Sequence, residues 1–117
     1  MEQNIYPNIR KTSTLSIIQE KHKVTVIKAY ANWCKPCKKI SPLIDKLVER
    51  QTNDFAFVPI NDRNVLFHYL EINKLPTLIC FVGFEKKLVL ESSKEEDVRE
   101  FFRKVESFYL AAPFNFS

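Results

Sequence analysis

Cysteine is scarce in this chain, which has three cysteines among its 117 residues. Three cysteines are too few to hold a small scaffold together by disulfides, and their odd number argues against complete pairing. We therefore expect a reducing compartment, the cytoplasm, in which the thiols are kept for chemistry.

Long apolar runs are also missing. No stretch approaches the roughly 18 apolar residues that a membrane-spanning helix needs. The first residues, MEQNIYPNIRK, contain no apolar core of the kind found in a signal peptide. We accordingly expect no membrane partner and no export.

The composition is that of a globular protein, with 45% hydrophobic and 13% aromatic residues and with charges spread along the chain. Its length suits one domain, which we expect to span residues 1–117. The net charge is +4, but lysines alternate with acidic residues, and no cluster combines basic and aromatic side chains. This distribution disfavours a nucleic-acid partner.

The segment ANWCKPCKK, residues 31–39, places Cys34 and Cys37 two residues apart. Such a pair can be half of a zinc site, a chance pair or a redox-active dithiol. Structural zinc needs four ligands, usually from a second close pair. The remaining candidates are scattered singly: His22, His68 and Cys80. The pattern therefore disfavours a zinc site. We expect both histidines to lie at the surface or beside helices, without partners. The third cysteine should be an inert core residue.

Four short runs rich in β-branched or apolar residues predict strands. A further, weaker strand is expected near residues 5–9, where Pro7 would limit it to the edge of a sheet. Gly83 separates the last two runs and predicts a hairpin between them. The four runs are KVTVIKAY (23–30), FAFVPI (55–60), TLICFV (77–82) and KKLVLE (86–91).

Helical spacing of apolar residues follows the cysteine pair, from Ile40 to Val48, and recurs from Val98 to Tyr109. Ser93 and Glu96 have the spacing of a capping box before the last helix. We expect a short helix over residues 13–20 and a second, brief helix that follows residues 61–65 and ends at residue 70. Beyond the last helix the tail carries two phenylalanines that we expect to pack back on the domain, Phe114 and Phe116.

The pattern A-x-W-C-x-P-C-K-x-I-x-P runs from Ala31 to Pro42, and Pro76-Thr77 follows about forty residues later. With the order of strands and helices, these motifs resemble the thioredoxin family over almost the whole chain. The resemblance implies the α/β thioredoxin fold, a central mixed sheet of four to five strands flanked by about four helices.

Disulfide exchange requires a thiolate, so the pKa of the attacking cysteine must fall from about 8.5 towards neutrality. Cys34 stands where the helix should begin, and there free backbone amides and the helix dipole favour negative charge. We therefore predict that Cys34 is the nucleophile and that Cys37 resolves the mixed disulfide. Pro36 should restrict the loop, keep the two sulfurs within bonding distance and help to set their potential.

The resemblance also implies a substrate-binding surface. Trp33 is either an aromatic side chain flanking the dithiol, which the family favours, or an ordinary core residue. Pro76 is either an ordinary turn proline or, as in the family, follows a cis peptide bond. In the second case the backbone of Leu75 lies beside the dithiol, and an extended substrate could pair with the segment from Leu75 to Thr77.

Two residues depart from the family pattern. Lys28 stands six residues before Cys34, where thioredoxins usually carry a buried aspartate, and the family's partner lysine has no counterpart near Phe57 and Val58. Three roles remain open for Lys28: its charge stabilises the Cys37 thiolate, burial keeps its amine neutral, or its side chain extends to solvent and has no effect.

Lys35 replaces the glycine that thioredoxins most often have between the cysteines. A cation beside Cys34 should stabilise the thiolate and make the potential less negative than the thioredoxin value of about −270 mV. The alternative is that salt screens this exposed charge.

The resemblance implies a protein-disulfide reductase that needs no cofactor of its own, acts as a monomer on disulfide-containing proteins and is recharged by an NADPH-dependent thioredoxin reductase. A glutaredoxin is disfavoured because its Gly-Gly pair is missing, and a disulfide isomerase because Pro36 replaces its usual histidine. The remaining alternative is a thioredoxin-fold binding module with weak or retuned redox activity.

Overall fold

The computed structural model describes residues 4–109. The expected packing of Phe114 and Phe116 therefore lies outside the described residues. Helices and strands follow one another along the chain as α1 (Thr12–Lys21), β1 (Val24–Tyr30), α2 (Lys35–Glu49), β2 (Phe55–Asn61), α3 (Leu66–Tyr69), β3 (Thr77–Val82), β4 (Glu85–Leu90) and α4 (Glu95–Ser107).

The strands form one mixed sheet in the order β2-β1-β3-β4. Strand β1 lies at its centre, parallel to β2 and antiparallel to β3, and β3 and β4 form the predicted hairpin. The expected strand near residues 5–9 shrinks to a single bridge between Ile5 and Phe57. Pro7 has no N–H to donate to a sheet, and Asn8 turns the chain with a φ of 64°.

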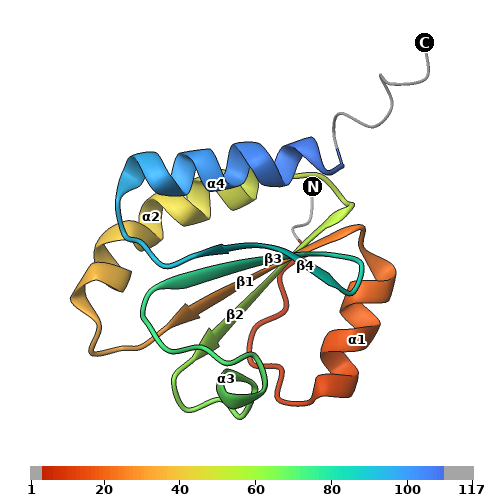
Figure 1. The fold of residues 1–117 in the computed structure, drawn as a ribbon, viewed down its shortest axis with the longest axis horizontal. Coiled ribbons are helices and arrows are strands. Elements are labelled where there is room, and N and C mark those ends of the chain that lie inside the picture. The colour runs from red at the N-terminus through yellow and green to blue at the C-terminus, as the bar shows by residue number, and fades with distance from the viewer. Residues whose placement is uncertain (1–3, 110–117) are drawn as a thin grey trace.

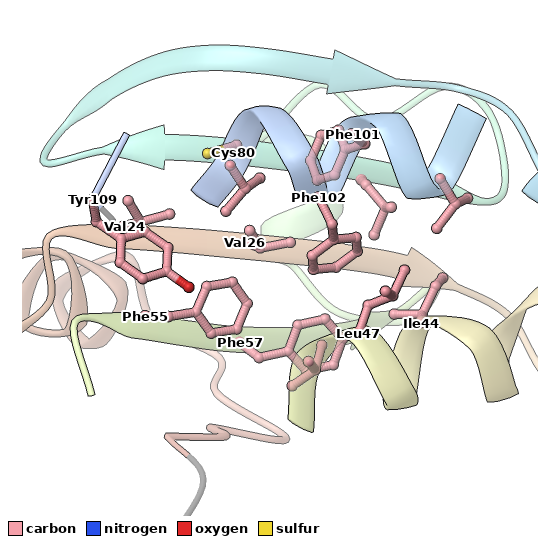
Figure 2. Packing of buried hydrophobic residues seen from close by; sticks show 14 of the residues in the cluster. Val24, Val26, Ile44, Leu47, Phe55, Phe57, Cys80, Phe101, Phe102 and Tyr109 are labelled. Carbon is pink, nitrogen blue, oxygen red and sulfur yellow. The ribbon is translucent and has the colours of Figure 1, made fainter. Parts of the chain in front are cut away.

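Helices cover both faces of the sheet, with α2 and α4 on one side and α1 and α3 on the other (Figure 1). Between the sheet and helices α2 and α4, aromatic rings pack among aliphatic side chains (Figure 2). Phe102 from α4 lies 6.4 Å from the ring of Phe55 and 5.5 Å from that of Phe101, between ring centroids. Leu15, from α1, belongs to a second core on the opposite face.

His22 is the C-cap of α1, so its predicted place beside a helix is confirmed. The prediction that it has no partner is wrong, because the ring is buried and bonded on both nitrogens. Its Nδ1 lies 3.0 Å from the carbonyl oxygen of Asn53 and its Nε2 lies 2.7 Å from the hydroxyl of Tyr6. A carbonyl only accepts, so Nδ1 is the donor, and a neutral ring accepts the Tyr6 hydroxyl at Nε2. His68 is exposed, as predicted.

The predicted capping box at Ser93 and Glu96 is wrong by one residue. Lys94 is the N-cap of α4, and its side chain makes no capping hydrogen bond to the helix. Instead Ser92 Oγ accepts a 3.1 Å hydrogen bond from the Lys94 N–H and donates a 2.7 Å bond to Asp97. Acidic residues in the first turn complement the helix dipole. Within residues 4–109, no helix has the length and apolar character to span a bilayer.

Candidate active site

The cysteine pair lies where β1 ends and α2 begins. Cys34 is the N-cap of α2, with an extended backbone, and Lys35 and Pro36 occupy the first two helical positions. Proline is tolerated there because its missing N–H would have had no partner within the helix. The helix therefore begins directly after Cys34, as predicted, and Cys37 belongs to its first turn.

Cys34 and Cys37 form a disulfide, with their Cα atoms 5.3 Å apart. The Cys37 N–H also donates a 3.2 Å hydrogen bond to Cys34 Sγ. Both cysteines are buried in this oxidised state, with exposed fractions of 4% and 3%. The first sulfur thus lies at the helix N-terminus with a backbone donor directed at it, the environment that favours a thiolate.

A small apolar cluster surrounds the disulfide. Ala31 belongs to it, and Tyr30 and Leu75 pack against it. The Leu75-Pro76 peptide bond is cis, as the family resemblance implied. Thr77 is buried, and its hydroxyl donates to the carbonyl oxygen of Lys74, so its side chain points into the fold. Of the three residues expected to bind substrate here, Leu75 packs against the disulfide cluster.

Trp33 lies outside the core, with 70% of its surface exposed. Its interpretation as an ordinary core residue is therefore wrong. The indole Nε1 donates a 2.9 Å hydrogen bond to Oδ2 of Asp62, which follows β2. Asp62 was not among the site residues predicted from the sequence, because nothing local in the sequence connects it to a tryptophan 29 residues away.

Lys28 is buried, with 8% of its surface exposed. The interpretation in which its side chain extends to solvent is wrong, because its Nζ donates a 2.6 Å hydrogen bond to Ser41 Oγ on α2. Burial lowers the pKa of Lys28 below its usual value, and the negative charge of Asp45 partly offsets this effect. Lys35 and Pro36, by contrast, are exposed.

Cys80 lies in β3 and is fully buried, which confirms its prediction as a core residue. Burial raises the pKa of its thiol to about 12, so the thiol stays protonated at neutral pH. Among residues 4–109, no three His, Cys, Asp or Glu side chains gather as a metal site would require. The disulfide is therefore the reactive feature that the described residues present.

The fold and the dithiol together define a thioredoxin-like protein, and comparisons with known proteins agree. The sequence pattern of the Thioredoxin family matches residues 7–104. A chloroplastic thioredoxin of Arabidopsis thaliana is 32% identical over 84 residues, which cover 69% of this chain and 43% of that protein. Thioredoxin-2 of Saccharomyces cerevisiae is 36% identical over 63 residues, which cover 52% of this chain and 60% of that protein.

Solved structures show the same fold. Schistosoma mansoni thioredoxin superposes with a TM-score of 0.73 at 26% identity, covering 86% of this chain and 94% of that structure. A Halobacterium salinarum thioredoxin gives a TM-score of 0.76 at 21% identity, covering 92% and 95%, and supports the fold alone. The chain belongs to the thioredoxin family. It spans about half of the length of the first two relatives, 43% and 60%.

Proposed function

We propose that this chain is a thiol-disulfide oxidoreductase that reduces protein disulfides through Cys34 and Cys37. One observation carries the proposal: a disulfide joins these residues across the first turn of α2, with the Cys37 N–H directed at Cys34 Sγ. In the reduced protein the same N–H and the helix N-terminus would stabilise a thiolate on Cys34.

The reaction then proceeds in two exchanges. The Cys34 thiolate attacks one sulfur of a substrate disulfide, forms a mixed disulfide and releases the other substrate sulfur as a thiolate, which takes a proton from water. The Cys37 thiolate next attacks Cys34 Sγ, which forms the Cys34–Cys37 bond and releases the second substrate sulfur. Two electrons pass to the substrate, and the protein is left in the oxidised state that the structure describes.

The substrate-binding surface in this proposal flanks the disulfide. Trp33 supports it because its ring is exposed and its edge is held by Asp62. Leu75 supports it because it packs against the cysteine pair and precedes the cis peptide bond. Pro76 and Thr77 are buried, so we assign them the shaping of this segment and expect an extended substrate to pair with its backbone. Lys35 and Pro36 would tune the potential from the first turn of α2.

Membership of the thioredoxin family supports disulfide-containing proteins as substrates and a reductase as the electron source. We propose that this reductase is an NADPH-dependent thioredoxin reductase and that the chain acts as a monomer. We also propose a reducing compartment, the cytoplasm, supported by the free thiol of Cys80 in a chain whose other two cysteines form an exchangeable pair.

Reduction of insulin, followed by turbidity with dithiothreitol as electron source, tests the proposed function. The wild-type chain should accelerate precipitation well above the reductant alone, and Cys34→Ser should abolish the acceleration. Cys80→Val is the matched control, because it removes a cysteine that takes no part in the exchange. A wild-type chain that gives no acceleration would reject the proposal and favour the binding module.

A further inference from the structure

The environment of Lys28 is unusual for a lysine. Strand β1 directs the side chain toward α2, where its Nζ donates to Ser41 Oγ at 2.6 Å. The same nitrogen lies 5.3 Å from the centroid of the Tyr30 ring. Both neighbours are uncharged, so a buried cation is solvated by a hydroxyl and an aromatic face.

No carboxylate forms an ion pair with Lys28 among the described residues. Asp45 on α2 interacts with it only at longer range, and this interaction raises the pKa of Lys28 less than burial lowers it. From β2 the facing residues, Phe57 and Pro59, carry no charge, and the partner on β3 is Leu78. Among the described residues, the ammonium thus lacks a close counter-ion while the cysteines are oxidised.

This lysine and one cysteine of the dithiol line the same cavity of about 540 Å³. Its lining includes Lys28, Ser41 and Asp45, and also Cys37, the resolving cysteine. The other titratable side chains on its wall are Tyr30 and Lys38. An ionised Cys37 would therefore place a negative charge on the wall of the same cavity as the Lys28 ammonium, which has no ion-pair partner among the described residues.

We propose that the Lys28 ammonium is the counter-charge of the Cys37 thiolate in the reduced protein, where the Cys34–Cys37 disulfide is broken. This inference rests on the proposed function, because it concerns the reduced form of the same pair. When a dithiol reductant delivers two electrons, the Cys34–Cys37 bond breaks, and the Cys37 thiol can lose its proton to water beside the ammonium. The thiolate then attacks the mixed disulfide as described above, and Lys28 keeps its proton throughout.

The attraction is reciprocal, as any coupling between two ionisable groups must be. A positive charge at Lys28 favours the thiolate of Cys37, and that thiolate favours the ammonium of Lys28. Closing the disulfide removes the negative partner, so Lys28 should lose its proton more readily in the oxidised protein than in the reduced one. Lys28 is in this sense a positioning residue that acts through Cys37.

The test titrates Cys37 alone, in a Cys34→Ser background, by the rate of alkylation with iodoacetamide from pH 5 to 10. Cys80 does not interfere, because its thiol is buried and protonated over this range. Lys28→Met should move the Cys37 midpoint upward by at least one pH unit, a tenfold loss of thiolate at a fixed pH below both midpoints. Lys28→Arg, which keeps the charge, should retain the wild-type midpoint within a few tenths.

Lys39→Met is the matched control, because Lys39 is an exposed cation on α2, the helix that carries Cys37. This substitution should leave the midpoint of the Cys37 titration unchanged. Both Lys28 variants are first checked for native circular dichroism, and Lys28→Gln, which is also uncharged, replaces Lys28→Met if that variant does not fold. An unchanged midpoint in Lys28→Met or Lys28→Gln would overturn the proposal, as would a Lys28→Arg variant that titrates like Lys28→Met. The titration needs no substrate, so its failure is distinct from a failure to reduce insulin.

Discussion

The indole nitrogen of Trp33 donates a 2.9 Å hydrogen bond to Oδ2 of Asp62, which fixes the edge of an otherwise exposed ring beside the dithiol. A segment after β2 thereby sets the position of the residue that precedes Cys34. The surface next to the reactive sulfur is preorganised by a contact between residues far apart in the sequence.

Replacing Asp62 with alanine should release the Trp33 ring. We expect lower tryptophan fluorescence anisotropy and a two- to fivefold loss in the rate of insulin reduction, with stability changed by less than about 1 kcal/mol, because the bond is exposed. Asp62→Asn retains an acceptor oxygen and should restore most of the rate. Equal losses in the two variants would indicate that the hydrogen bond does not position the ring.

Lys35→Gln should make the potential of the cysteine pair more negative, because it removes a cation next to Cys34. An exposed charge interaction of about 0.2 to 1 kcal/mol corresponds to about a 1.4- to 5-fold change in the equilibrium constant against glutathione. The effect should shrink in 1 M salt. Lys39→Gln serves as the control, and an equal shift in both variants would argue against a local effect of Lys35.

Tyr6→Phe should destabilise the protein by about 1 to 3 kcal/mol, because it removes a hydroxyl that bonds the buried ring of His22. Urea unfolding measures the loss. The control is Tyr69→Phe, since Tyr69 is 61% exposed and should tolerate the change within about 0.5 kcal/mol. Equal stability of Tyr6→Phe and wild type would mean that His22 is satisfied by Asn53 alone.

The oxidised protein should lose stability as the pH rises above 9. Burial raises the pKa of Cys80 from 9.0 to about 12 and that of Tyr109 from 10.0 to about 12. Between these values the unfolded chain binds fewer protons than the folded one, so the free energy of unfolding falls with pH, by at most about 1.4 kcal/mol per pH unit for each group.

Cys80→Val removes one of these two groups. Urea unfolding at pH 8 and pH 11 should therefore show a smaller alkaline loss in Cys80→Val than in wild type, by about 1 to 3 kcal/mol. A variant with the wild-type slope would show that the Cys80 thiol ionises equally readily in the folded and unfolded states.

Much of the fold follows from local patterns. The run predicted at residues 77–82 forms β3 with the same bounds. The cysteine pair lies at the N-terminus of α2, as predicted, because a β-branched run ends where helical spacing begins. The errors are equally local: Pro7 and Asn8 reduced a predicted strand to one bridge, and the N-cap of α4 is Lys94 instead of Ser93.

The contacts that shape the site could not be predicted in this way. Strand β1 is covered on both faces, so alternation of polar and apolar residues did not show which way Lys28 points. Its bond to Ser41, the bond of Trp33 to Asp62 and the burial of His22 all depend on segments brought together by the sheet. The sequence showed which side chains could take part in the chemistry, but it did not show their hydrogen-bond partners.

The most direct test of the central claim is trapping of the mixed disulfide. Reduced Cys37→Ser, which lacks the resolving thiol, is mixed with oxidised insulin, and its mass is measured under non-reducing conditions. Our account predicts an adduct linked through Cys34, released by dithiothreitol and absent from Cys34→Ser. No adduct, or one linked through Cys80, would contradict the assignment of Cys34 as the nucleophile.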